Sequence, residues 1–317
     1  MAYPWGTYRR FNAYSDYFRK VFGERVQKLS VNAGFTCPNR DGTVGRGGCA
    51  FCDNRAFNPS YNEACKPVRQ QLDEGIAFHK NRYRKVRKYL AYFQAYSNTY
   101  APLEELKVIY QPAMDHPDVV GIVIGTRPDC VDQEKLDYFE QLAKDLYLVI
   151  EYGIESINNT TLAAINRGHT FEATRHAIIE TAARGIRTGG HMIIGLPGET
   201  REQWIRSVEV LSALPLHSIK FHQLQIIRGT AMERKYQDDP ERFHFFEMEE
   251  YLQLMAGIIE RLNPFIVVER IAGEVNPGTA SRKGWGLRYD RILARFEEIM
   301  EERNTWQGRL YEKQENI

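Results

Sequence analysis

The chain of 317 residues lacks the features that would assign it to a membrane or to a secretory pathway. Nothing in its first residues, MAYPWGTYRRFNAYSDYF, resembles a signal peptide. No apolar run approaches the roughly 20 residues that a bilayer-crossing helix needs, and candidates such as HMIIGL have the length of a strand. We therefore expect a globular protein of the reducing cytoplasm, with no membrane partner.

An excess of charge of one sign is also missing, because 42 Lys and Arg stand against 41 Asp and Glu. A nucleic-acid partner would therefore have to meet a local basic patch and not the whole surface. One basic run, KNRYRKVRKY, has tyrosines among its cations, which would suit phosphate contacts with base stacking. The alternative is a solvated helix face. The basic residues in question are Arg82, Arg84, Lys85, Arg87 and Lys88.

Cysteine is scarce, yet three of the five cysteines fall in one short stretch, CPNRDGTVGRGGCAFC. These are Cys37, Cys49 and Cys52. Thiolates bind iron-sulfur clusters or zinc, and a C-x-x-C pair with a third cysteine on a glycine-rich loop brings three sulfurs to one point. A four-iron cluster held by three cysteines keeps one iron free to bind a substrate or cofactor, whereas a structural site fills every position with side chains.

The cysteine stretch alone leaves other interpretations open. Structural zinc needs four Cys or His ligands, and because no histidine occurs between Phe35 and Phe78, Cys65 is the nearest candidate for the fourth. Unligated thiols are a further possibility, and a disulfide is the least favoured in a reducing cytoplasm. Cys65 and Cys130 form no second cysteine-rich motif, so we otherwise expect them to be buried small hydrophobic residues.

Short β-rich runs alternate with amphipathic segments along most of the chain. Helical periodicity marks DQEKLDYFEQLAKD, TFEATRHAIIETAARG and TREQWIRSVEVLSAL, with Gly185 at an expected helix end. Strand and helix in alternation predict a parallel sheet. Six such units without a linker predict an α/β fold, a partial (β/α)6 TIM-like barrel. The β-rich runs are RVQKLSVN, KYLAYFQAYS, VVGIVIGT, LYLVIEYGIES, TGGHMIIGL, SIKFHQLQII and FIVVERI.

Two extensions flank the predicted barrel, which we expect to span residues 24–270. Residues 1–23 are aromatic enough to pack as a lid or flap. Residues 271–317 contain a charged helix, RYDRILARFEEIMEERN, whose apolar face should dock on the body. That face consists of Ile292, Leu293, Phe296, Ile299 and Met300.

Ligands of parallel α/β folds bind at the carboxyl ends of the strands, and several polar residues fall there. Glu151 and Glu155 could be paired catalytic carboxylates, could bind hydroxyls or amines, or could face solvent. The GLPGET turn after the fifth run could be a plain strand-to-helix connection. His191, His222 and Tyr152 are near strand ends as well, where each is either a proton donor or a packed core residue.

Five motifs in order along the chain resemble the radical S-adenosylmethionine (SAM) superfamily, and within it the branch related to the catalytic subunit of Elongator. The resemblance covers roughly residues 25–275 and concerns the radical domain only, because nothing here resembles an acetyltransferase domain. The motifs are CPNRDGTVGRGGCAFC, EYGIES, INRGHT at Ile165 to Thr170, HMIIGLPGET at His191 to Thr200, and IIRGT at Ile226 to Thr230.

This resemblance implies a 4Fe-4S cluster on Cys37, Cys49 and Cys52, with SAM chelating the free iron. An electron from a reductase or a flavodoxin- or ferredoxin-type donor would then cleave SAM to a 5'-deoxyadenosyl radical. The stretch of Ser97, Asn98 and Thr99 matches the position that recognises the methionine amino group.

Further roles follow from the same resemblance. Glu155 and Ser156 match the motif near the ribose, and Gly195 matches the position beside adenine. Arg167 looks like the residue that pairs with the methionine carboxylate, a contact suited to a guanidinium fork. The alternative for Arg167 is a surface charge at a helix end.

For the substrate, the resemblance points to tRNA. Relatives with the INRGHT and IIRGT patterns act on the wobble uridine, and the implied reaction processes its 5-substituent, for example carboxymethylaminomethyl to aminomethyl. Two alternatives remain: a radical SAM enzyme acting on a small molecule or a porphyrin-like substrate, and a zinc-stabilised RNA-binding module.

Overall fold

The computed structural model describes residues 2–53, 59, 61–82, 86–274 and 278–313. Its centre is a sheet of seven parallel strands, in which each strand pairs with the next one along the chain. The strands are Val26–Val31 (β1), Lys88–Phe93 (β2), Val119–Thr126 (β3), Tyr147–Glu155 (β4), Arg187–Ile194 (β5), Ser218–Gln223 (β6) and Val267–Arg270 (β7).

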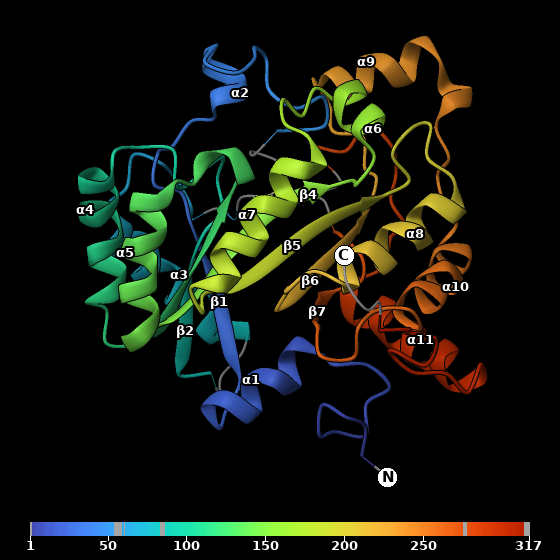
Figure 1. The fold of residues 1–317 in the computed structure, drawn as a ribbon, viewed down its shortest axis with the longest axis horizontal. Helices are drawn as coiled ribbons and strands as arrows, with labels where there is room; N and C mark the ends of the chain where they lie inside the picture. Colours follow the sequence, from blue (N-terminus) through green and yellow to red (C-terminus); the bar gives the residue numbers. More distant parts are fainter. Residues whose placement is uncertain (1, 54–58, 60, 83–85, 275–277, 314–317) are drawn as a thin grey trace.

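Helices cover the outer face of this curled sheet (Figure 1). Six of them connect successive strands and pack around the body: Val68–Arg82 (α3), Leu103–Met114 (α4), Gln133–Asp145 (α5), Phe171–Ala183 (α7), Arg201–Ser212 (α8) and Met248–Ile259 (α10). The smaller Pro38–Asp41 (α2), Asn159–Ala164 (α6) and Ala231–Asp238 (α9) lie near the carboxyl ends of the strands. The predicted partial barrel is therefore confirmed, with a seventh strand completing the sheet.

Strand burial explains why these runs were recognisable in the sequence. Strands covered on both faces read as nearly continuous apolar runs, and β3 and β4 are buried over almost their whole length. The helix ends also follow local sequence. Thr200 and Gln203 form a capping box at the start of α8, and Gly185 takes a φ of 73° just after α7.

The N-terminal segment, which we expected to pack as a lid or flap, lies at the amino end of the barrel. Helix α1 (Tyr14–Phe22) packs on β1 and β7, at the opposite end of the molecule from α2 (Figure 1). Phe18 is buried in a separate apolar cluster with Val26 and Tyr147, the first residues of β1 and β4. Aromatic residues of this segment therefore cover the amino end of the barrel.

The C-terminal helix α11 (Tyr289–Glu302) docks on α10 as its apolar face predicts. Ile292, Phe296, Ile299 and Met300 are buried in the main core, and Leu293 is partly buried against it. Phe296 also meets Phe11 of the N-terminal segment edge to face, with ring centroids 5.6 Å apart. The two ends of the chain thus pack together beside β7.

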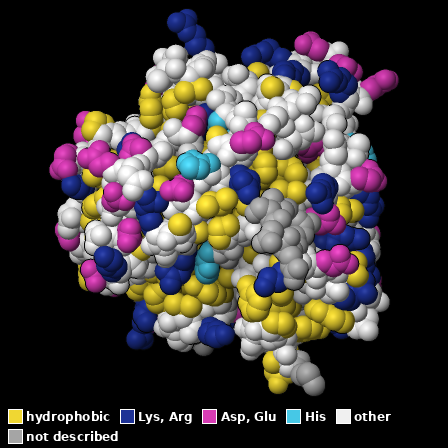
Figure 2. All heavy atoms as spheres, viewed as in Figure 1, with side chains coloured by type: hydrophobic (Ala, Val, Ile, Leu, Met, Phe, Trp, Pro, Cys, Tyr) yellow, Lys and Arg dark blue, Asp and Glu magenta, His cyan; other side chains and the backbone are white. Residues whose placement is uncertain are grey.

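Surface charge is mixed on the face drawn in Figure 2, where basic and acidic side chains are interspersed around a more apolar centre. This agrees with the nearly balanced composition. Within the described ranges, no helix is long and apolar enough to cross a membrane.

Candidate functional site

The cysteine stretch forms a compact loop at the carboxyl end of the sheet. Cys37 is the N-terminal flanking residue of α2, and its carbonyl oxygen accepts a hydrogen bond from the amide of Arg40 at 2.8 Å. Cys37 and Cys49 are buried, Cys52 is partly buried, and none of the three is in a disulfide. The amide of Cys52 donates to the carbonyl of Cys49 at 3.0 Å, which closes the C-x-x-C turn.

Asn39 ties this loop to the INRGHT segment. Its buried amide Nδ2 donates to the carbonyl of Asn166 at 2.5 Å and lies 3.7 Å from the sulfur of Cys49. A side chain at Gly45 would collide with Asn39 Oδ1. The glycines of the cysteine stretch therefore allow the backbone to fold closely around Asn39.

Arg167 lies beside the cysteines and not on the surface, so the helix-end alternative is wrong. Its side chain is 8% exposed. One terminal nitrogen donates to the sulfur of Cys49 at 3.2 Å, and the other donates to the carbonyl of Gly153 at 2.6 Å. Burial by itself lowers the pKa of Arg167, but Cys49 and Glu155 outweigh it and the pKa is raised overall. The guanidinium remains charged.

Glu155 ends β4 in an unusual backbone conformation, with a φ of 65°. A residue other than glycine pays a conformational cost in this region, which is common at functional sites. Its carboxylate lies 3.6 Å from Arg167 Nη2. Gly153 is required beneath this pair, because an added Cβ would meet Arg167 Nη2 and would lie 2.6 Å from Glu155 Oε1.

The Ser97–Thr99 turn lies against the cysteine loop and is fully buried. The amide of Ser97 donates to the carbonyl of Thr36 at 3.2 Å, next to Cys37. Asn98 donates through Nδ2 to the carbonyl of Gly125 at 2.8 Å, while Thr99 is bonded to Thr126 and to the carbonyl of Cys130. The turn is rigid and adjoins the cysteines.

Ser156 and Gly195 belong to a neighbouring network and do not contact the cysteines or Arg167 through any bond found among the described residues. Ser156 Oγ donates to Glu199, which also accepts from Trp204 Nε1 at 2.8 Å. Burial raises the pKa of Glu199. Gly195 has a φ of 94°, and a side chain there would approach Phe246 to 3.1 Å. The GLPGET turn is thereby fastened to the end of β4.

The chemistry around the three thiols fits an iron-sulfur cluster with an organic ligand. Asn98 Oδ1 and Arg167 Nε are buried without a hydrogen-bond partner, and such groups are costly unless a ligand completes them. Burial, followed by the nearby Cys49, raises the pKa of Cys52 to about 12. A thiolate in this position therefore needs a compensating cation, which a cluster supplies.

Within the described residues, no group of three His, Cys, Asp or Glu side chains is placed to hold a single metal ion. The ligands of one zinc ion all lie at roughly 2.0–2.3 Å from that ion, whereas the cysteines of a four-iron cluster bind separate iron atoms. Cys65 is exposed, with its sulfur 3.8 Å from Glu63. The expectation that it is a buried hydrophobe is wrong, while Cys130 is buried as expected.

The barrel interior contains a ring of charges that the sequence did not reveal. Lys28 of β1 and Lys220 of β6 each bind both Glu151 of β4 and Glu269 of β7. His191 of β5 adds a fifth contact, from Nε2 to Glu151 Oε2 at 2.9 Å. Glu151 therefore neither faces solvent nor pairs with Glu155.

Glu151 is ionised in this ring. Burial by itself raises the pKa of Glu151, but Lys220, Lys28 and His191 together hold it well below its usual range. The pKa of His222 is lowered by burial and then by Arg270 and His191, so His222 is neutral. Tyr152 is buried on the other face of β4 and bonds Thr181 at 2.7 Å, which makes it a core residue.

Most of the basic run lies outside what the structure describes. Arg84, Lys85 and the side chain of Arg82 lie outside the described residues, and Arg87 is exposed. Lys88 donates to the carbonyl of Phe22 at 3.0 Å and lies 3.5 Å from Glu24. As the first residue of β2, Lys88 is at the amino end of the barrel, opposite the cysteines.

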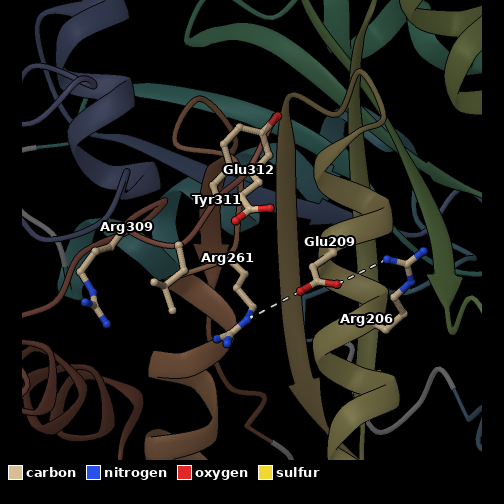
Figure 3. Close-up of a pocket in the computed structure, with 7 residues that line it drawn as sticks. Arg206, Glu209, Arg261, Arg309, Tyr311 and Glu312 are labelled. Carbon is tan, nitrogen blue, oxygen red and sulfur yellow. Dashed lines mark ion pairs between the residues drawn. The ribbon is translucent and has the colours of Figure 1, made fainter. Parts of the chain in front are cut away.

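One large surface cavity, of about 570 Å³, is separate from all of these residues. It lies between α8, the turn after α10 and the C-terminal segment (Figure 3). Its arginines are engaged, because Arg206 and Arg261 both pair with Glu209 and Arg309 pairs with Glu260. We assign it no role in the site.

Comparison with known proteins gives a consistent result. A family model described as the radical SAM superfamily matches residues 36–211, and one described as the radical SAM C-terminal domain matches residues 216–302. The uncharacterized protein YtqA of Bacillus subtilis is 32% identical over 98% of this chain and 95% of its own length.

Relatives named for Elongator are more distant. Elongator complex protein 3 of Saccharomyces cerevisiae is 24% identical over 57% of this chain and 32% of its own length. The solved structure of Elp3 from the archaeon Methanocaldococcus infernus has a TM-score of 0.66 at 16% identity, over 89% of this chain and 64% of that one. At this identity, the structural likeness concerns the fold.

Proposed function

The chain belongs to the radical SAM superfamily, and on that premise we propose that it modifies the 5-substituent of the wobble uridine in tRNA. As a member of the family it is an enzyme whose cofactors are a 4Fe-4S cluster and SAM. In the reaction that we propose, a substituent such as carboxymethylaminomethyl becomes aminomethyl. Loss of a hydrogen atom from the carboxymethyl carbon and of one electron, returned to the electron donor, would leave an imine, which water would hydrolyse to the aminomethyl group and glyoxylate.

The single observation that carries the chemistry is the loop of Cys37, Cys49 and Cys52 with the Arg167 guanidinium on the sulfur of Cys49. These three cysteines would hold the cluster. Bound there, the cluster supplies the electron for reductive cleavage of SAM, which yields a 5'-deoxyadenosyl radical able to take hydrogen from an unactivated carbon. The protein excludes water around the sulfurs by burying two of them.

Residues around the loop are suited to orient SAM. Arg167 has an unpartnered Nε and a fixed fork, which suits a carboxylate, so we assign it to the methionine carboxylate. The Ser97–Thr99 turn, with the free Oδ1 of Asn98, would accept from the amino group. Glu155 would accept from a ribose hydroxyl, with Ser156 and Gly195 shaping the ribose and adenine side of the site.

The tRNA substrate is proposed from the Elongator-like motifs and from the relatives named for Elongator. The electron donor that we propose is a reductase or a flavodoxin- or ferredoxin-type protein. The division into residues 1–23, 24–270 and 271–317 also remains a proposal, in which the two ends buttress a catalytic barrel.

Nucleoside analysis tests the proposed substrate. Bulk tRNA from a strain lacking the gene is incubated anaerobically with reconstituted protein, SAM and dithionite, then digested and analysed by mass spectrometry. We expect one 5-substituted uridine to decrease as another increases, and a Cys49→Ala protein to leave both unchanged. An unaltered nucleoside profile with SAM-cleaving wild-type protein would instead favour a small-molecule substrate.

A further inference from the structure

The charge ring forms a floor inside the barrel. Lys28 Nζ lies 2.5 Å from Glu151 and 2.7 Å from Glu269, and Lys220 Nζ lies 2.7 Å and 3.0 Å from the same two carboxylates. Strands β1 and β7 are the sheet edges and do not pair with each other. The Lys28–Glu269 contact therefore joins the two edges by side chains and fixes the width of the barrel at this depth.

The residues one layer nearer the carboxyl end are polar or small. Side chains two positions apart on a strand share a face, so Ser30 and Gly153 lie above Lys28 and Glu151, and His222 lies above Lys220. Ser30 Oγ donates to Gln94 at 3.3 Å. Ser30, Gln94, Gly153 and His222 are all partly exposed although they face inward. Solvent therefore reaches the interior above the floor.

His191 stands in this layer with one nitrogen fixed and one available. Its imidazole is 24% exposed, and Nε2 is held by Glu151. Because Glu151 is an ionised acceptor, Nε2 must donate, and in the neutral ring Nδ1 then carries a lone pair. No hydrogen bond to Nδ1 is found among the described residues. Nδ1 is therefore the ring nitrogen left to form a hydrogen bond with a group in the interior.

A continuous series of contacts links this acceptor to the cysteines. Cys49 accepts from Arg167, and Arg167 donates to the carbonyl of Gly153. Gly153 is the register partner of His191 in the β4–β5 pair. The imidazole is therefore one strand away from the backbone group that holds Arg167.

We propose that His191 contacts the substrate, accepting a hydrogen bond at Nδ1 from an N–H or O–H of the group that is modified, and that Glu151 is the positioning residue that orients the ring. The amine of a carboxymethylaminomethyl substituent has the required donor. The inference rests on the proposed function, because it assumes that the substrate enters the barrel above the charge ring.

Two substitutions separate the nitrogens of His191. In His191→Asn the side-chain oxygen replaces Nδ1 but cannot reach Glu151, and in His191→Gln the amide reaches Glu151 but leaves the Nδ1 position empty. His176→Gln, an exposed histidine on α7, is the matched control. Each protein is measured for iron content, for 5'-deoxyadenosine formed without substrate, and for the extra 5'-deoxyadenosine formed with tRNA from the deletion strain.

Iron content and substrate-independent cleavage should stay within about twofold of wild type, because His191 does not touch the cysteines. The extra 5'-deoxyadenosine formed with tRNA should fall about tenfold or more in His191→Gln. It should fall less in His191→Asn and should be unchanged in His176→Gln. If a His191 variant loses its cluster, Glu151→Gln tests the same contact, because it keeps the imidazole but removes the ionised carboxylate that orients it; we expect a loss of about fivefold in tRNA-dependent cleavage.

Unchanged tRNA-dependent cleavage in His191→Gln, or in Glu151→Gln where that variant is used, would overturn this inference and leave the proposed function standing. Wild-type protein that cleaves SAM without any response to tRNA would overturn the proposed substrate, and the inference with it. The two failures are therefore distinguishable.

Discussion

Arg167 donates to the sulfur of Cys49 at 3.2 Å, across 118 positions of sequence. The same guanidinium holds the carbonyl of Gly153, so a single side chain connects the cysteine loop to β4. This link makes the geometry of the cysteines depend on residues of the barrel wall, and several measurable consequences follow from it.

Replacing Arg167 by Lys should weaken SAM binding more than it destabilises the protein. A lysine ammonium cannot bond the sulfur of Cys49 and the carbonyl of Gly153 with a fork that also offers Nε. We expect the Kd for SAM to rise about tenfold to a hundredfold, the scale of one charged hydrogen bond. Equilibrium dialysis with labelled SAM measures it. Arg234→Lys, at an exposed position on α9, is the control, and equal Kd values in both variants would contradict the role.

Gly153→Ala should damage the site through its methyl group alone. The added Cβ would meet Arg167 and Glu155, so we expect SAM cleavage to fall about tenfold while circular dichroism stays unchanged. The matched control is Gly257→Ala on α10, where a Cβ meets nothing within 4 Å. That helical substitution should stabilise the protein by about 0.5–1 kcal/mol. Full activity in Gly153→Ala would show that Arg167 has another place to lie.

The charge ring should make stability sensitive to acid. The folded-state pKa of Glu151 is depressed below its ordinary value of 4.5, so its contribution is fully present above pH 4.5 and is lost as pH falls through the folded pKa. Glu151→Gln removes one carboxylate from two buried lysines and should lower the free energy of unfolding by about 3 kcal/mol at neutral pH.

Urea unfolding at pH 7, at pH 4 and at lower pH values measures both effects. The variant should lose less stability than wild type between pH 4 and still lower pH values, because the titrating group is gone. Two parallel stability profiles over that acid range would mean that Glu151 does not titrate with folding. Glu63→Gln, an exposed carboxylate, should change stability by less than about 0.5 kcal/mol.

Much of the fold was predictable from local sequence, and the reason is physical. Strands β3 and β4 are buried, nearly continuous apolar runs, and α8 begins at a capping box written in TREQ. The cysteine loop was recognisable because its ligands are close in sequence. The charge ring was not recognisable, because the partners of its lysines are up to 241 positions away in sequence.

Two further features were left open by the sequence. The aromatic N-terminal segment suits either end of a barrel, and its packing of Phe18 against Val26 and Tyr147 decides for the amino end. Arg167 follows α6, where a helix-end charge was the alternative to a role in the site, and tertiary contacts bury it against Cys49. Whether a single polar residue is buried depends on partners that are distant in sequence, and a local periodic pattern does not show them.

Cysteine replacement should separate cluster ligands from the other thiols. Cys37→Ala, Cys49→Ala and Cys52→Ala should each reduce bound iron after anaerobic reconstitution to a small fraction of that in wild type. Cys65→Ala should leave iron unchanged, because its thiol is exposed. Iron and sulfide analysis with the brown cluster absorbance measures the effect. Equal loss in Cys65→Ala would require a fourth protein ligand and would contradict an open iron.

The most direct test of the account is the release of 5'-deoxyadenosine by reconstituted protein under anaerobic conditions, with SAM and dithionite, in the presence and absence of tRNA from the deletion strain. We predict release that rises several-fold with tRNA and disappears in Cys49→Ala. Protein with a full cluster that releases no 5'-deoxyadenosine under either condition would contradict the account.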